Sequence, residues 1–137
     1  MNNPITISAV ISCSKQTAWE YYTQPQHIVN WNFASDDWEC PSATNNLTPG
    51  GKYTTRMQAK DGSFGFDLEA IYTEVIAHDK ICYSLYDDRA VEILFRDVDG
   101  GTEVTLHFEA ESENPREMQQ QGWQAILNNF KKYCESK

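Results

Sequence analysis

Residues 114–137 place the strongest constraint on the fold, because they form the clearest amphipathic helix in the chain. Asn114 is a capping residue, Pro115 suits the first helical position, and Glu117 follows the cap by three residues, as in a capping box. The apolar residues recur at steps of three and four, which places them on one face of a helix. They are Trp123, Ile126, Leu127, Phe130 and Cys134. Such a face needs an apolar partner, which the rest of the chain must supply.

Two residues interrupt this apolar face near its start. Gln119 lies one turn before Trp123 but is polar. Gly122 costs about 1 kcal/mol relative to alanine inside a helix, so it suggests close packing against a neighbour. Two interpretations remain open: the whole face is core, or its N-terminal half lines a cavity.

The preceding chain predicts an antiparallel sheet with two short helices near its start. Residues 4–12 alternate as a strand, Ser14 caps a helix over 15–23, and Pro25 begins a second helix over 26–31. Further strands are expected at residues 52–60, 64–76, 81–86, 89–98 and 102–111. The fold class is therefore α+β, with a curved sheet wrapped round the long C-terminal helix. One helix need not fill a strongly curled sheet, which leaves room for a cavity.

Residues 32–49 are the least regular segment, and they contain Phe33 and Trp38. A long loop in a small domain is often a lid or a binding loop, so we expect these aromatic residues to cover the cavity. The alternative is a surface loop anchored by its aromatic side chains. A strand near residues 37–41 is a further interpretation.

Bulk properties narrow the classes of partner. The length of 137 residues suits one domain over residues 1–137, and the net charge of 11 − 20 = −9 argues against a nucleic-acid or anionic-membrane surface. No run approaches the ~18 apolar residues of a membrane span, and the N-terminus lacks the features of a signal peptide. The four cysteines form no C-x-x-C pair, so no metal site is predicted, and no cofactor. We expect a cytoplasmic protein with free thiols.

Five short motifs follow one another in an order that carries a family resemblance. They are residues 14–25 with Trp19, the Ile28 to Trp31 helix, Gly50-Gly51 at a strand entry, Gly101-Thr102 at a hairpin, and Gly122-Trp123 with Leu127. This order resembles the AHSA1 family, the activator-of-Hsp90-ATPase homologues, within the SRPBCC (START-like, Bet v 1-like) superfamily. The resemblance implies a helix-grip fold with a deep pocket between helix and sheet that often takes hydrophobic ligands.

The expected ligand is therefore a small hydrophobic molecule, lipid-like or aromatic, bound without catalysis. The candidate lining residues are mostly aromatic, with a thioether and a few polar groups. They are Trp31, Phe33, Trp38, Thr55, Met57, Phe66, Tyr83, Phe95, Gln119, Trp123 and Ile126. Thr55, Tyr83 and Gln119 are expected to supply the polar contacts, and a packed core is the alternative for each residue taken singly.

No catalytic residue is predicted. Nucleophile-elbow and phosphate-loop motifs are absent from the sequence, and the three histidines share no face, with His27 expected on the surface. Asp67 and Glu69 share a strand face opposite Phe66, so we expect them on the solvent side. The opposite register would turn both acids into the cavity as candidates for acid–base catalysis.

Two other functions stay open. The resemblance suggests a protein-interaction module for an Hsp90-type chaperone, although the eukaryotic activator carries such a domain after a separate N-terminal domain that is not found here. A cyclase- or hydrolase-type enzyme of the superfamily is the second, and it requires an acid or a histidine inside the pocket. The sequence predicts no oligomeric state.

Overall fold

The computed structural model describes residue 1 and residues 3–137. Its helices are α1 (Lys15–Thr23), α2 (Pro25–Ile28) and α3 (Arg116–Glu135). Its strands are β1 (Ile5–Ile11), β2 (Trp38–Asn45), β3 (Lys52–Ala59), β4 (Gly65–Ile76), β5 (Lys80–Leu85), β6 (Ala90–Val98) and β7 (Gly101–Phe108). In this part of the chain no helix is long and apolar enough to cross a bilayer.

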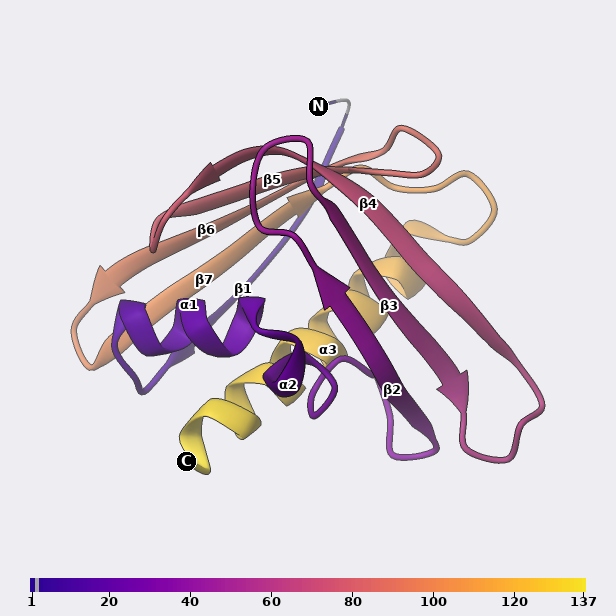
Figure 1. Ribbon diagram of the computed structural model, residues 1–137, viewed down its shortest axis with the longest axis horizontal. Helices are drawn as coiled ribbons and strands as arrows, with labels where there is room; N and C mark the ends of the chain where they lie inside the picture. The colour runs from indigo at the N-terminus through magenta and orange to yellow at the C-terminus, as the bar shows by residue number, and fades with distance from the viewer. Residues whose placement is uncertain (2) are drawn as a thin grey trace.

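The strands of the described chain form one seven-stranded antiparallel sheet in the order β1-β7-β6-β5-β4-β3-β2. Strands β2 to β7 follow one another as a meander, and β1 returns to pair with β7, with Ile5 opposite Phe108. Helix α3 crosses the concave face of this sheet, and α1 and α2 lie near its C-terminal end (Figure 1). The predicted α+β helix-grip fold is therefore confirmed.

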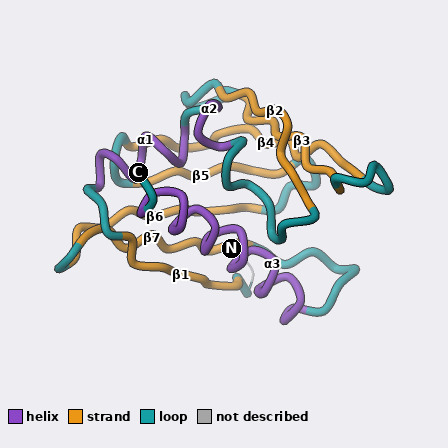
Figure 2. Tube along the Cα trace, turned by 90° about the horizontal axis from the view of Figure 1, so that it is seen from below, coloured by secondary structure: helices purple, strands orange, loops and turns teal. Residues whose placement is uncertain are grey.

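The sheet bends away from α3 on one side. The β4–β5 register shifts between Tyr72 and Glu74, and the β2–β3 register shifts between Glu39 and Ser42. Such bulges bend a strand and increase its twist. The backbone of α3 packs along β1 and against α1, as Figure 2 shows from below, whereas β3 and β4 lie farther off. The helix and this half of the sheet therefore diverge.

The C-terminal half of α3 belongs to the core, as predicted. Leu127, Phe130 and Cys134 are buried. The ring of Phe130 packs edge-on against Tyr22 and Trp31, with centroid distances of 5.0 Å to each. These contacts join α3 to α1 and to the segment after α2.

Residues 32–49 were the least accurately predicted segment, because they contain the eight-residue strand β2. The expected strand near residues 37–41 lies at its start but is too short. Strand β2 is the sheet's edge and carries mostly half-buried or exposed residues, so it shows no apolar alternation. Pro41, which lies at its bulge, is tolerated because an edge strand need not use every N–H group.

Three smaller predictions were also wrong. The second helix ends at Ile28 rather than Trp31. His27 is half-buried rather than exposed, because its ring nitrogen Nδ1 lies 2.6 Å from the Tyr133 hydroxyl. No capping box starts α3: Pro115 is the capping residue, and it makes no side-chain hydrogen bond. The N–H group of Asn114 instead donates to Glu111 Oε1 at 2.6 Å.

Gly122 does not mark a close contact, contrary to the sequence-based expectation. A methyl group built at Gly122 meets no atom within 4 Å, leaving aside the adjoining helix backbone. Replacing Gly122 with alanine should therefore raise the free energy of unfolding by about 0.5–1 kcal/mol, because glycine loses more backbone entropy on folding. Urea denaturation measures this change.

Gly101→Ala is the contrasting variant. There the added Cβ would lie 1.9 Å from the carbonyl oxygen of Ile11, so we expect lower stability. A loss of stability in Gly122→Ala would mean that this position is packed after all.

Candidate ligand pocket between helix α3 and the sheet

A cavity of about 420 Å³ occupies the space where α3 and the sheet diverge. Helix α3 contributes Gln119, Trp123, Ile126 and Leu127 to its wall. The sheet contributes Tyr53 and Met57 from β3, Phe66 and Leu68 from β4, and Tyr83 and Leu85 from β5. Tyr22, Trp31 and Asn32 close the end beneath the short helices. This volume lies within the range of small-molecule sites.

The wall is mainly apolar, and it includes three tyrosines whose hydroxyls have no partner among the described residues. Tyr22, Tyr53 and Tyr83 line the cavity, and their hydroxyls form no hydrogen bond with a described residue. None of these oxygens is sealed off by protein atoms, since Thr55 Oγ1 alone is both sealed and unpartnered in the described chain. The cavity therefore offers an apolar ligand hydrogen-bonding groups at its inner end.

Burial keeps these tyrosines neutral. It raises the pKa of Tyr22 and of Tyr53 well above the usual value, and nearby tyrosines add to the effect on each. Burial also raises the pKa of Tyr83, and the pKa of Tyr72 despite a hydrogen bond from its hydroxyl to Asn45 Oδ1. At neutral pH the hydroxyls can thus both donate and accept.

This burial predicts a loss of stability in alkali. The pKa values of these tyrosines are higher in the folded protein than in the unfolded chain. Above pH ~10, the ordinary tyrosine pKa, the folded protein therefore holds more protons than the unfolded chain. The contribution of these tyrosines to the free energy of unfolding is therefore constant below pH ~10 and falls as the pH rises further. Denaturation at a series of pH values measures the loss of stability, and tyrosinate absorbance at the same pH values measures how many tyrosines have ionised. Ionisation of all seven tyrosines of the intact fold near pH 10 would contradict it.

Seven of the eleven candidate lining residues meet at the cavity, namely Trp31, Met57, Phe66, Tyr83, Gln119, Trp123 and Ile126. Trp123 stacks on Phe108 with ring centroids 4.1 Å apart. The helical stripe and the strand alternation bring these residues to one place, although they are distant in the sequence.

Four candidates lie elsewhere. Phe95 is buried under α1, where its ring contacts Trp19 at 5.3 Å. Thr55 is fully buried, and its hydroxyl lies behind the cavity wall rather than on it.

The two aromatic residues of the expected lid lie away from the cavity. Trp38 contacts Phe64 and Phe66. The carbonyl of Phe33 accepts a hydrogen bond from Asn129. Because neither Phe33 nor Trp38 lines the cavity, the expected lid over it is not found.

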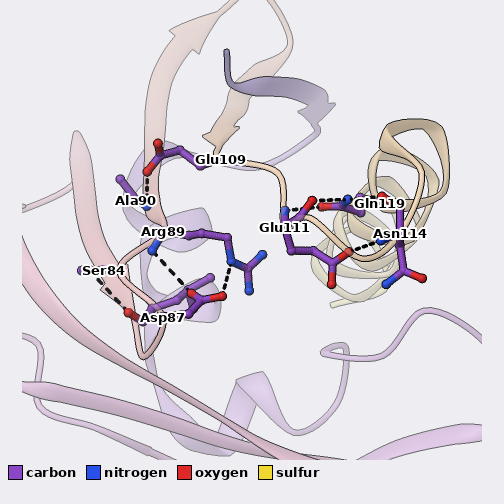
Figure 3. Close-up of polar contacts among 9 residues, drawn as sticks. Ser84, Asp87, Arg89, Ala90, Glu109, Glu111, Asn114 and Gln119 are labelled. Atoms are coloured by element: carbon purple, nitrogen blue, oxygen red, sulfur yellow. Dashed lines mark hydrogen bonds and ion pairs between the residues drawn. The ribbon is translucent and has the colours of Figure 1, made fainter. Parts of the chain in front are cut away.

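Gln119 lines the cavity, and its side-chain amide hydrogen-bonds to the backbone of the loop between β7 and α3. Its Nε2 donates to the carbonyl oxygens of Glu111 at 3.1 Å and Asn114 at 2.8 Å, and its Oε1 accepts from the Glu111 N–H at 2.9 Å (Figure 3). The polar residue on the apolar stripe therefore joins α3 to the loop that precedes it. This contact explains the interruption in the stripe.

Replacing Gln119 with leucine should lower the free energy of unfolding by about 1–3 kcal/mol, because half-buried backbone groups of Glu111 lose their partners. Urea denaturation gives this value. Gln120→Leu makes the same chemical change at an exposed neighbour and should have little effect. Equal effects of the two variants would mean that the loop contact contributes nothing.

Charged residues gather at the mouth of the cavity. Asp67, Arg89 and Glu111 line it there, together with the exposed Tyr86. Asp67 pairs with Arg56 at 3.5 Å and Glu69 with Lys52 at 2.7 Å. Glu69 does not line the cavity, in agreement with the expectation, whereas Asp67 is exposed but also borders the cavity mouth. No histidine is among the described residues that line the cavity.

Sequence reasoning missed several wall residues. Tyr53 lies two residues from Thr55 on the same strand face, so the alternation contained the signal. Tyr22 lies three residues after Trp19 in the expected helix over residues 15–23, so the helical period contained a signal for it too. Arg89 begins the expected strand over residues 89–98 and lies two residues before the buried Val91, so the alternation contained a signal for it as well.

Comparison with known proteins supports the same architecture. Residues 12–135 match the family described as activator of Hsp90 ATPase homolog 1-like protein. An AHSA1-like protein from Aeromonas hydrophila is 38% identical, with a TM-score of 0.92 over 97% of this chain and 92% of that one. A protein from Cytophaga hutchinsonii is 43% identical, with a TM-score of 0.84 over 98% of this chain and 94% of that one. No curated protein matches the sequence.

A more distant structure shows how far the fold extends. A protein from Nitrosomonas europaea is only 16% identical, yet has a TM-score of 0.83 over 97% of this chain and 94% of that one. This likeness concerns the fold alone. Together with the family match and the two relatives of higher identity, it leads to one conclusion: the chain belongs to the AHSA1-like family of the helix-grip superfamily.

Proposed function

We propose that this protein binds a small hydrophobic molecule, lipid-like or aromatic, in the cavity between α3 and the sheet, and acts as a carrier or sensor without catalysis. The observation that carries the proposal is a cavity of about 420 Å³ with a mainly apolar wall and unpaired tyrosine hydroxyls at its inner end. Apolar walls with a few placed polar groups are typical of ligand sites.

The wall composition favours binding over catalysis. The acids nearest the cavity, Asp67 and Glu111, lie at its mouth, and each already has a protein partner. The inner end presents neutral tyrosines instead of an acid–base pair. We also propose a cytoplasmic location, since the four cysteines are free thiols, which suit a reducing compartment.

Thermal unfolding in the presence of apolar compounds tests the proposal. A ligand at 100 times its Kd should stabilise the folded protein by about 2.7 kcal/mol and raise Tm accordingly. A panel of alkanols, alkanoates and two-ring aromatic compounds covers the relevant shapes. The proposal is overturned if no compound in the panel shifts Tm and organic extracts of the purified protein contain no bound molecule.

A protein-interaction module for an Hsp90-type chaperone is the second candidate. Exposed aromatic side chains favour it: Phe64 is 61% exposed and Tyr86 76%. Calorimetry with a purified Hsp90-type chaperone tests this candidate, with Phe64→Ser as the variant that should lose affinity. Absence of binding by the unmodified protein rejects it.

A further inference from the structure

Arg89 at the mouth of the cavity differs from the other arginines in the described chain. Arg56, Arg96 and Arg116 each use a terminal guanidinium nitrogen to bind a protein oxygen. Within the described chain, the guanidinium of Arg89 binds protein only through Nε, which donates to Asp87 Oδ2 at 2.6 Å. Its two terminal nitrogens therefore keep four N–H donors without a partner among the described residues.

The turn between β5 and β6 holds this side chain in place. Asp87 accepts from both the backbone N–H and the Nε of Arg89, and Leu85 N–H donates to the Arg89 carbonyl at 2.9 Å. The Arg89 side chain is only 21% exposed and lines the cavity. Figure 3 shows its guanidinium extending from this turn toward the side where the Glu111 loop lies. Because Asp87 holds the Nε edge of the guanidinium, the two terminal nitrogens are positioned to bind a planar anion.

We propose that the ligand is an apolar carboxylic acid, with its carboxylate on the guanidinium of Arg89 and its tail in the cavity. This inference rests on the proposed ligand-binding function and specifies the chemical class of the ligand. The two terminal nitrogens match the two oxygens of a carboxylate in a bidentate contact. The tail then passes Ile126 and Leu68 toward the tyrosine hydroxyls at the inner end.

The neighbouring acids favour a carboxylate over a phosphate. Asp67, Asp87 and Glu111 all lie at or beside the mouth. A carboxylate brings one negative charge, whereas a phosphate monoester brings about −1.5 to −2 at pH 7 and meets stronger repulsion. Arg89 pairs with Asp87 and forms no ion pair with Glu111 in the described structure, where one Glu111 oxygen accepts from the Asn114 N–H.

Calorimetric titration with three probes of equal chain length tests the inference: decanoate, 1-decanol and decylamine. We expect decanoate to bind the unmodified protein most tightly. Arg89→Met should weaken decanoate binding by about 10- to 100-fold, the value of a charge-assisted contact, and leave 1-decanol binding nearly unchanged. Arg89→Lys keeps the charge but loses the fork, so an intermediate loss for decanoate is expected.

Arg96→Met is the matched control, because Arg96 lies exposed on β6, the strand that follows Arg89, and pairs with Glu103. It should leave all three affinities unchanged. Retained 1-decanol binding in Arg89→Met shows that the cavity is intact. If the methionine variant does not fold, the decanoate and 1-decanol affinities of Arg89→Lys are compared instead.

The outcomes separate the two proposals. Three results would overturn the carboxylate inference and leave a hydrophobic-ligand function in place. They are tight 1-decanol binding with no preference for decanoate, a preference for decylamine, and equal weakening of decanoate and 1-decanol binding in both Arg89 variants. Failure of all three probes to bind the unmodified protein, together with an empty organic extract, overturns the proposed function and this inference with it.

Discussion

Replacing Phe130 with alanine is expected to lower the free energy of unfolding by about 3–5 kcal/mol, the usual cost of removing a buried aromatic side chain. Phe130 is fully buried, and its ring lies where α3 meets α1 and the segment after α2. A domain has only about 5–15 kcal/mol of stability, so this single change removes a large share of it. Urea denaturation of the two proteins measures the difference.

Met118→Ala is the control on the same helix. Met118 is 56% exposed, so its truncation should change the stability by less than about 0.5 kcal/mol. If Phe130→Ala costs as little as Met118→Ala, the C-terminal half of α3 is not the core element described above.

Replacing Ile126 with tryptophan is expected to abolish binding of apolar ligands. Ile126 is half-buried, and its side chain borders the cavity. The larger ring takes up space that a ligand needs, so affinity should fall by at least about 100-fold, or 2.7 kcal/mol. Overpacking a filled core costs about 1–3 kcal/mol, but here the ring enters free space and stability should change less. Calorimetry and denaturation together separate the two effects.

Gln121→Trp controls for the added aromatic ring, because Gln121 is exposed on the same helix. It should bind ligand as the unmodified protein does. Undiminished binding by Ile126→Trp would place the ligand somewhere other than this cavity.

Much of the fold was predictable because its elements have strong periodic signals. The stripe on α3 and the alternation in β7 are each produced by one buried face, and the helix Lys15–Thr23 was predicted with its Ser14 cap. Strand β2 was mostly missed because an edge strand has little buried surface to impose alternation. Pairing of β1 with β7 joins segments that lie far apart in the sequence, and local patterns carry no such information.

The site was less predictable than the fold, for a related reason. Trp123, Ile126 and Met57 could be assigned to the concave face from periodicity. Whether a residue on that face lines a cavity or packs tightly, as Phe95 does beneath α1, depends on where the helices lie. The use of Gln119 as a loop contact and the pairing of Arg89 with Asp87 depend on loops and turns, whose hydrogen bonds follow no period.

The proposed ligand occupies the space between the N-terminal half of α3 and the sheet. The most direct measurement is a set of intermolecular nuclear Overhauser effects between 1-decanol and the protein's methyl groups. We expect contacts with Met57, Leu68 and Ile126, which line the cavity. Contacts confined to exposed side chains such as Ile71 and Met118, or none at concentrations that should saturate the site, would contradict this placement of the ligand.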